Sequence, residues 1–517
     1  MKAPFDIPAD LDTPVSAFLK LKDFNPLFLL ESVTGGEHLG RYSFIGLGEA
    51  LSVRLTADGL HIDGKTQPRP GSQDELMVAL RGALANAPVL GDDELKLPFR
   101  GGLVGAAAYD VVRYFEDLPN KNAPLDLPDM HYVAPESVLV FDHLTRRAGV
   151  LHGGSDVARR ALSNNVAAAL RGPLPPSPGP ATIGPAEASI AEPDFLDHVR
   201  EAQESIAAGD VYQLVLSVCF SGQCDVSPFE VYRALRLLNP SPYMYYLALD
   251  DTYVVGSSPE ALVTLNADGV ASLRPIAGTR PRSDDPQVDM AHADELVADP
   301  KEIAEHVMLV DLARNDLGRV ASPGSVAVDP YRVIERYSHV MHLVSGVSGA
   351  LEAPHDAFDL FAAAFPAGTL VGAPKVKAMS LIEQAEPVRR GWYAGTVGYF
   401  GHGNTMDQAI AIRTMILRNG RYSFQAGAGI VADSDPQSEY NEVLAKSQIL
   451  RQAPAWASAR SLRSSTCSSA ACSVLADSLM RASSSGSCSS AYCPPGSERS
   501  RGGTAPLQCC ACCGARP

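Results

Sequence analysis

Hydrophobic and polar positions alternate over many short stretches of the chain, and elsewhere the apolar residues recur every three or four positions. Alternation predicts strands, whereas the longer period predicts helices with one buried face. The predicted strands are residues 211–220, 243–249, 253–256, 262–265, 396–400, 408–417 and 422–426. The predicted helices are residues 75–87, 193–208, 300–316, 357–364 and 373–384. Because the strands form meanders instead of alternating regularly with helices, the pattern predicts an α+β fold.

Composition changes twice along the chain. Residues 171–190 are rich in Pro and Gly, which indicates a linker or surface loop between an N-terminal region, 1–170, and a catalytic region, 191–452. We do not interpret this linker as a boundary between independent domains, because later strands can return to pair with earlier ones. Residues 453–517 lose all periodicity and gather Ser, Cys and Arg, so we expect a disordered tail or an out-of-frame translation.

Charge and cysteine placement exclude several classes of protein. The formal net charge is −16, and an acidic chain argues against nucleic-acid binding. Eight of the ten cysteines lie in the tail, without a second cysteine or histidine pair that would complete a zinc site. No apolar run is long enough to cross a bilayer, and the N-terminus lacks the apolar core of a signal peptide. These features predict a cytoplasmic protein with no membrane partner.

Two acidic pairs are the strongest chemical signal in the sequence. Each pair follows an Asp-Pro dipeptide, which favours the start of a helix, and its members are three residues apart on one helix face. The pairs are Glu302 with Glu305 and Glu439 with Glu442. A single such pair is most often a capping residue beside a solvated one. Two pairs that open in the same way predict a Mg²⁺ site, because a hard cation relieves the repulsion among carboxylates.

Three further motifs suggest binding of an anionic substrate. Arg413 stands inside an otherwise apolar predicted strand, and a buried guanidinium needs a partner such as a substrate carboxylate. The turn at Gly368-Thr369 offers backbone N–H groups and a hydroxyl. Gly427 and Gly429 predict a tight loop through which backbone donors can approach a carboxylate. Each signal alone is weak, but together they indicate a small, multiply anionic substrate bridged to Mg²⁺.

The order of the motifs over residues 1–452 resembles that of the chorismate-utilising enzymes, and among them the anthranilate synthase component I group. The motifs are LLES, GDVYQLVLS, PSPYMYYL, VGSSPEAL, PIAGTRPR, KEIAEHVMLVDLARNDLGRV, ERYSHVMHLVS, FPAGTLVGAPK, YAGTVGY, IAIRT, AGAGIV and SEYNEVLAK. The resemblance implies two β-sheets stacked as a sandwich with helices outside. It also implies conversion of chorismate and ammonia to anthranilate and pyruvate, the first step of tryptophan biosynthesis.

The resemblance assigns roles to individual residues. Glu305 and Glu442 would ligate Mg²⁺ directly, and the other glutamate of each pair would support them. Glu260 matches the general acid that protonates the departing 4-hydroxyl, and His342 matches the histidine tied to pyruvate elimination. The remaining site residues implied are catalytic Thr369 and substrate-binding Gly278, Thr279, Tyr393, Arg413, Gly427, Ala428, Gly429 and Lys446.

Three positions distinguish the sister activities within this group. Isochorismate-forming and salicylate-forming enzymes carry Lys where this chain has Gln213, and a Gln there suits ammonia, which is already nucleophilic. Aminodeoxychorismate synthases carry Lys where this chain has Ala277. The presence of His342 favours an enzyme that completes the elimination of pyruvate and forms anthranilate. The alternatives left open are another aminating chorismate enzyme, which makes aminodeoxychorismate or aminodeoxyisochorismate, and a non-catalytic protein that senses tryptophan.

Two segments resemble the tryptophan feedback site of these enzymes. They contribute Leu30, Glu31 and Ser32 from LLES and Pro242, Tyr243 and Met244 from PSPYMYY. The alternative interpretation of LLES is an ordinary strand end. No Gly-x-Cys-x-Gly nucleophile motif of a glutamine amidotransferase occurs. The resemblance therefore implies a separate amidotransferase subunit, component II, in a heterotetramer with two copies of each subunit.

Overall fold

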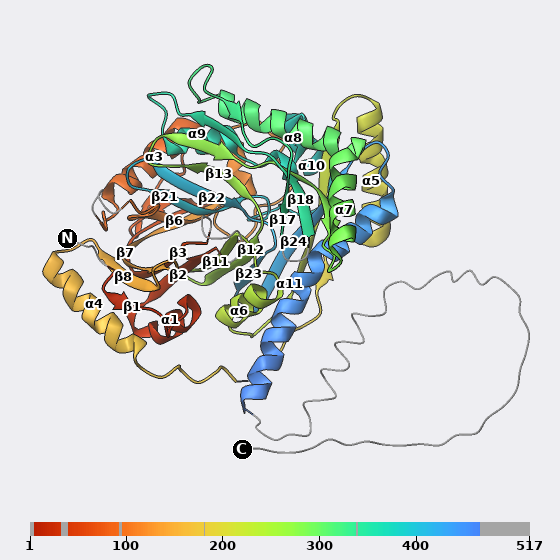
Figure 1. Ribbon diagram of the computed structural model, residues 1–517. Coiled ribbons are helices and arrows are strands. Elements are labelled where there is room, and N and C mark those ends of the chain that lie inside the picture. Colours follow the sequence, from red (N-terminus) through yellow and green to blue (C-terminus); the bar gives the residue numbers. More distant parts are fainter. Residues whose placement is uncertain (1–4, 33–39, 92–95, 180, 338–339, 466–517) are drawn as a thin grey trace, which may run out of the picture. The chain divides into compact units, whose positions relative to one another are not determined.

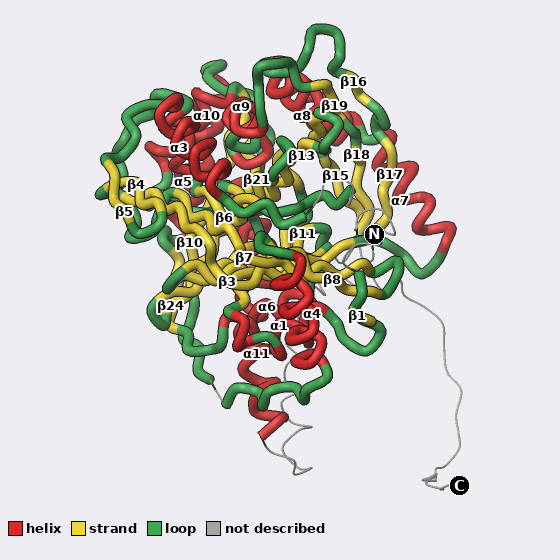
Figure 2. The backbone as a smooth tube through the Cα atoms, turned by 90° about the vertical axis from the view of Figure 1, so that its left-hand side faces the viewer, coloured by secondary structure: helices red, strands yellow, loops and turns green. Residues whose placement is uncertain are grey.

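The structure is a computed structural model that describes residues 5–32, 40–91, 96–179, 181–337 and 340–465. The chain divides into two units, residues 1–465 and 466–517, and the second lies outside the described residues. Within the described residues, 21 strands join into one large curled sheet and three more form a small sheet, all paired antiparallel. Helices flank these strands, as Figures 1 and 2 show, and the prediction of an α+β fold is confirmed.

The helices and strands have the following bounds. The helices are α1 Pro14–Lys20, α3 Gln73–Asn86, α4 Asp156–Leu170, α5 Glu192–Ala207, α6 Pro228–Leu238, α7 Pro286–Ala298, α8 Pro300–Gly318, α9 Ala357–Ala364, α10 Lys375–Ala385 and α11 Pro436–Ser465. The strands before residue 191 are β1 Ile7–Pro8, β2 Pro26–Glu31, β3 Tyr42–Thr56, β4 Gly59–Ile62, β5 Lys65–Gln67, β6 Gly102–Ala107, β7 Met130–Asp142, β8 Arg147–His152 and β9 Glu187–Ala188. The later strands are β10 Gln213–Gln223, β11 Tyr243–Leu249, β12 Thr252–Ser258, β13 Ala261–Leu265, β14 Val270–Leu273, β15 Ile276–Pro281, β16 Ala327–Val328, β17 Val333–Arg336, β18 Val340–Val344, β19 Val347–Ala350, β20 Gly372–Ala373, β21 Thr396–Gly401, β22 Thr405–Ile410, β23 Thr414–Arg418 and β24 Arg421–Ile430.

Strands from the two ends of the sequence complete each other. Strand β2 pairs with β11, and β6 pairs with β21, so the N-terminal region and the catalytic region share one sheet. Their apolar side chains also share two large core clusters. The Pro/Gly-rich stretch at 171–190 is therefore a connection within one folded unit, as the sequence led us to expect. No helix in the described ranges is long and apolar enough to cross a membrane.

Two predictions about local structure are wrong. The stretch 408–417 is two strands, because the chain changes partners between them: β22 pairs with β13 and β21, whereas β23 pairs with β12 and β24. Arg413 lies in the break with φ of 49°, a left-handed conformation that cannot continue a strand. Gly427 and Gly429 lie inside strand β24 and not in a loop, since β10 pairs with them along its length.

The last helix is longer than the sequence indicated. Residues 453–517 showed no periodicity, but α11 continues to Ser465 with Pro454 inside it. The physical reason is burial, because Leu450, Ala453 and Ala457 recur every three or four positions and are fully covered by the core. The prediction of a disordered or out-of-frame tail otherwise concerns residues outside the described ones.

Candidate active site

The two acidic pairs lie near the starts of α8 and α11, as predicted, with Glu302 and Glu439 in the first turns. Asp299 caps α8 by accepting hydrogen bonds from the backbone N–H groups of residues 301 and 302, and Pro300 occupies the first helical position. Asp435 caps α11 in the same manner by accepting from the N–H of Ser438 at 2.9 Å. The helix N-termini therefore fix the backbone positions from which all four glutamates project.

The glutamates of the two helices repel one another. Burial raises the pKa of Glu305, and the neighbouring charges of Glu302 and of Glu442 on α11 raise it further. Burial also raises the pKa of Glu439, again with a contribution from Glu442. No group of three or more His, Cys, Asp or Glu side chains in the described part of the chain is close enough to enclose a metal ion. The carboxylates thus face the same region without forming a closed cage.

Cationic and hydroxyl groups hold three of the four glutamates at the edges of this region. Arg280 donates to Glu302 at 3.2 Å, and Lys446 donates to Glu442 at 2.7 Å. The Ser434 hydroxyl donates to Glu439 at 2.6 Å. Lys446 also donates to the carbonyl of Gly427 at 3.2 Å, which links α11 to strand β24. Glu305 is the least compensated member, and a cation with an anionic ligand would fit beside it.

Glu260 lies in a small cleft whose walls are mostly apolar. Burial raises its pKa to about 7, although the Thr369 hydroxyl, which donates at 3.4 Å, and the charge of Arg413 both lower it. The guanidinium of Arg413 has no hydrogen bond or ion pair to any described residue, and burial lowers its pKa. A carboxyl group whose pKa lies near neutrality is therefore close to a cation that has no hydrogen-bonded partner among the described residues.

His342 lies on β18, beside β15. Its Nδ1 is 3.0 Å from the carbonyl oxygen of Gly278 and 3.1 Å from the hydroxyl of Thr279, and its ring meets that of Tyr337 edge to face. Burial lowers its pKa, so the ring is neutral at neutral pH and one nitrogen remains able to accept a proton. The segment Ala277–Thr279, which contains a register shift, thus holds the histidine in a defined orientation.

The glycines of the predicted site are required where another element approaches closely. Gly278 has φ of 66°, and a Cβ there would lie 2.9 Å from a carboxylate oxygen of Glu302. A Cβ at Gly427 would lie 2.8 Å from the hydroxyl of Tyr393, and one at Gly429 would lie 2.7 Å from the amide nitrogen of Gln213. Ala428, between them, pairs with Leu216 of β10. Side chains on β10 and near β21 therefore lie directly against this strand.

The residues proposed for tryptophan binding lie on two neighbouring strands. Leu30 pairs with Tyr245 and Glu31 with Met244, while Ser32 directly follows β2 and Pro242 directly precedes β11. Burial raises the pKa of Tyr243 well above its usual value, and the nearby carboxylate of Asp407 raises it further. The two motifs, far apart in sequence, are thus brought together at one edge of β2 and β11.

Sequence reasoning missed several residues that organise these sites. Tyr232 and Arg236 of α6 both donate to Glu31, and Arg280 binds Glu302. Glu386 and Arg390 form a buried ion pair. A Glu and an Arg four residues apart are common on helix surfaces, so this spacing gave no signal that the pair is buried.

Comparison with known proteins identifies the family. A model of the chorismate binding enzyme family matches residues 26–452. This chain belongs to the chorismate-binding enzyme family. The family match spans β2 to the first half of α11 and so includes every candidate site residue named above.

Relatives refine this assignment. Anthranilate synthase component 1 of Thermus thermophilus is 45% identical over 86% of this chain and 96% of its own length. Its counterpart in Pseudomonas aeruginosa is 44% identical over 88% and 95%. The crystal structure of anthranilate synthase component I from Streptococcus pneumoniae is similar with a TM-score of 0.71 and 35% identity, over 87% of this chain and 100% of that one. The chain is accordingly an enzyme of the family, a lyase of the anthranilate synthase type.

Proposed function

We propose that this enzyme converts chorismate and ammonia to anthranilate and pyruvate, with Mg²⁺, as the first step of tryptophan biosynthesis. The observation that carries the proposal is that Glu260 and Thr369 line one cleft and that the charge of Arg413 acts on Glu260. Chorismate has two carboxylates and a hydroxyl leaving group. A proton donor beside an unpaired guanidinium therefore matches both the bond that breaks and the charge that must be held.

The proposed reaction has two steps, and a different residue acts in each. Ammonia adds to the ring while Glu260 protonates the departing 4-hydroxyl, which leaves as water. The aminated intermediate then loses a ring proton and its enolpyruvyl group, so that pyruvate and the aromatic amine form. His342 is neutral and lies beside Gly278 and Thr279, and it is the residue that we assign to this second step. Arg413, Tyr393 and the backbone of Gly427, Ala428 and Gly429 hold the enolpyruvyl carboxylate, and Lys446 stands beside Gly427.

We propose that the four glutamates form a magnesium site that is open to water and substrate. Oxygen ligands from one or two carboxylates, completed by water and an anionic substrate, are typical of Mg²⁺ in enzymes, and such a site needs no closed protein cage. Glu305 and Glu442 are the direct ligands that we propose, with Glu302 and Glu439 in support, and repulsion among Glu302, Glu305 and Glu442 supports this assignment. When bound, Mg²⁺ supplies a counter-charge for the ring carboxylate.

We propose tryptophan as the feedback inhibitor and a separate amidotransferase, component II, as the source of ammonia from glutamine. The convergence of Leu30, Glu31 and Ser32 with Pro242, Tyr243 and Met244 supports the first proposal. The name of the relatives, component 1, supports the second, and a heterotetramer with two copies of each subunit is the assembly that we propose.

A sister activity is the nearest alternative. Isochorismate formation is disfavoured because position 213 holds Gln, whose side chain lies beside Glu305 and Gly429 instead of offering a base. Ala277 is buried against Leu343 and cannot attack the ring, which disfavours the route through a covalent lysine.

The test is anthranilate fluorescence from the purified chain with chorismate, ammonium and Mg²⁺, with and without tryptophan. We expect a signal that requires Mg²⁺ and falls when tryptophan is added. Consumption of chorismate without anthranilate would instead identify a sister activity. No consumption of chorismate would favour the non-catalytic, tryptophan-sensing alternative, which binding of tryptophan to the inactive chain would then establish.

A further inference from the structure

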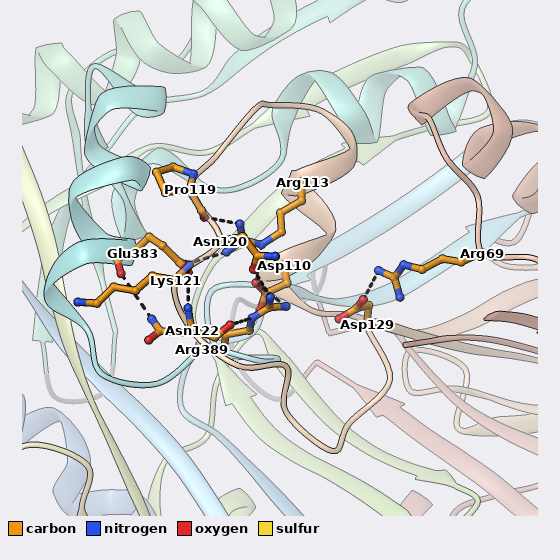
Figure 3. A network of polar contacts seen from close by, with 10 residues as sticks. All are labelled: Arg69, Asp110, Arg113, Pro119, Asn120, Lys121, Asn122, Asp129, Glu383 and Arg389. Atoms are coloured by element: carbon orange, nitrogen blue, oxygen red, sulfur yellow. Dashed lines mark hydrogen bonds and ion pairs between the residues drawn. The ribbon is translucent and has the colours of Figure 1, made fainter. Parts of the chain in front are cut away.

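Two adjacent arginines after α10 point to opposite sides of the chain. Arg389 faces the N-terminal region, where it donates to the carbonyl of Asn122 at 3.0 Å and lies 3.6 Å from Asp110. Figure 3 shows this side, in which Arg113 and Glu383 complete a polar network that ties the 119–122 loop to the end of α10. Arg390 points the other way, into the interior, and its side chain is almost completely buried.

Arg390 makes four hydrogen bonds there, to three separate segments. Its Nε and one terminal nitrogen donate to Glu386 at 2.9 and 2.7 Å. The same terminal nitrogen donates to the carbonyl of Val215 at 2.8 Å, and the other donates to the carbonyl of Leu370 at 2.7 Å. The guanidinium also lies 5.6 Å from the ring centre of Tyr393. One planar cation thus connects β10, the turn at 368–370 and the segment that carries Tyr393.

Each of these segments carries a residue of the candidate active site. Leu370 belongs to the short 3₁₀ turn, Gly368–Leu370, whose Thr369 donates to Glu260. Val215 pairs with Gly429 on β24 and lies two residues after Gln213. The hydroxyl of Tyr393 lies against Gly427. The relative positions of the proton donor, the carboxylate-binding strand and Tyr393 therefore depend on one guanidinium.

Glu386 in turn fixes the guanidinium to the large sheet. Its Oε1 accepts from the backbone N–H of Ser217 at 2.9 Å and from the Ser217 hydroxyl at 2.6 Å. Gln425 donates to the same hydroxyl at 2.8 Å, so the carboxylate is bonded on several sides. A buried ion pair contributes little stability that well-packed apolar residues could not supply. What it supplies here is a fixed geometry between segments that are more than 150 residues apart.

We propose that Arg390, oriented by Glu386, is a positioning residue that sets the distance between Glu260 and the residues that hold the substrate. This inference rests on the proposed function, because that function gives Glu260, Thr369 and Tyr393 their roles. A Lys in place of Arg390 keeps the charge, but its single ammonium cannot reach both carbonyls and both oxygens of Glu386.

The experiment compares Arg390→Lys with Arg389→Lys, a matched change one residue away whose contacts face the loop in Figure 3. Steady-state rates of anthranilate formation are measured between pH 6 and 9 at saturating Mg²⁺ and ammonium, together with thermal unfolding. For Arg390→Lys we expect kcat to fall at least tenfold while KM for chorismate changes less. Arg389→Lys should change both constants less than twofold.

The pH profile separates positioning from a loss of folding. Thr369 and Arg413 lower the pKa of Glu260, and Arg274 and Asp316, the latter paired with Lys375, line the same cleft. If Leu370 and Thr369 shift in Arg390→Lys, Glu260 loses a hydrogen bond that favours its charged form, and its pKa rises. The basic limb of the pH profile, which is the fall in rate as Glu260 loses its proton, then moves to higher pH. A merely structural role would lower the unfolding temperature and leave that limb unchanged.

A milder variant covers the case in which Arg390→Lys does not fold. Ser217→Ala removes only the hydroxyl bonded to Glu386, and we expect the same changes at about a third of their size. Folded Arg390→Lys with unchanged kcat and basic limb would overturn the proposal, and so would an unchanged Ser217→Ala if Arg390→Lys is insoluble. Absence of turnover in the unaltered chain would instead contradict the proposed function, and the role of Arg390 with it.

Discussion

Two regions of this molecule each contain a buried or half-buried glutamate, and the surroundings of the two glutamates are opposite. Glu31, at the end of β2, accepts hydrogen bonds from Tyr232 and from Arg236 at 3.0 and 3.2 Å. Glu305, in the second turn of α8, faces Glu302 and Glu442, and burial together with these like charges raises its pKa. The first carboxylate has its counter-charge within the chain, whereas the second has neighbours that oppose its ionisation.

This difference distinguishes an acidic residue that stabilises the fold from one that takes part in a functional site. A buried carboxylate bonded to its own donors stabilises the fold, and its removal leaves other groups unpaired. A carboxylate set against like charges destabilises the folded protein at neutral pH, since the folded state binds the proton more tightly than the unfolded state does. Such an arrangement fits a site that is completed by a cation. Replacing the glutamate with glutamine should lower the stability of the folded protein in the first case, and should leave it unchanged or raise it in the second.

The largest expected effect is that of Glu305→Gln. Loss of a proposed direct Mg²⁺ ligand should lower kcat/KM at least 100-fold at a fixed, subsaturating Mg²⁺ concentration. Because the substitution removes repulsion, thermal unfolding without metal should occur at the same or a higher temperature. The matched control is Glu295→Gln on neighbouring α7. This substitution breaks the ion pair between Glu295 and Arg280, and it should change the rate less than twofold. A large loss of stability in Glu305→Gln would contradict the comparison.

The second prediction concerns pH and Glu260, which is half-buried and, unlike Glu31, has no ion pair with any described residue. Its pKa of about 7 means that the protonated fraction falls as the pH rises through 7. As a general acid it should therefore give a basic limb in kcat near pH 7, with about a tenfold loss per pH unit above that value. The profile of chorismate consumption from pH 5.5 to 9 measures it. Glu260→Gln should lower the rate by a factor of about 10²–10⁴ and abolish the limb.

Glu31→Gln is expected to act mainly on stability. The substitution leaves the guanidinium of Arg236 without its charged partner and weakens the bond from the buried Tyr232. We expect a loss of about 1–3 kcal/mol in the free energy of unfolding, measured with urea, and retention of uninhibited activity. Inhibition by tryptophan should be lost at the same time.

Glu230→Gln is the control for that experiment, since Glu230 is bonded to Arg233 on the same helix, α6, and is not one of the residues proposed for either site. It should lower stability without changing inhibition. If Glu31→Gln remained fully inhibited by tryptophan, the assignment of the feedback site to β2 and β11 would be wrong.

The smallest expected change in catalysis is that of Ser32→Phe. The position directly follows Glu31 and lies at the edge of the proposed tryptophan site, far along the chain from the acidic helices. Steric exclusion of the ligand should abolish inhibition, while kcat and KM for chorismate change less than twofold. Inhibition curves with increasing tryptophan, read by anthranilate fluorescence, distinguish the two outcomes.

Much of the fold could be predicted from the sequence, because its signals are local. The strand at Tyr243–Leu249 and the helix at Ala357–Ala364 have the predicted bounds, since alternation and capping residues act over a few positions. The Asp-Pro openings of α8 and α11 were predicted for the same reason. The break at Arg413 was missed because it arises from an exchange of strand partners, which depends on distant segments.

The sequence by itself determined the α+β class, the helical position of the acidic pairs and the family, because periodicity, capping and ordered motifs are written in neighbouring residues. Only the tertiary structure decided which charges have partners. Glu31 meets Arg236 across 205 positions, and Arg390 meets Val215 across 175. The free energy of a charge in a folded protein depends on its burial and on the groups around it, and the folded chain brings those groups together from segments that no local pattern connects.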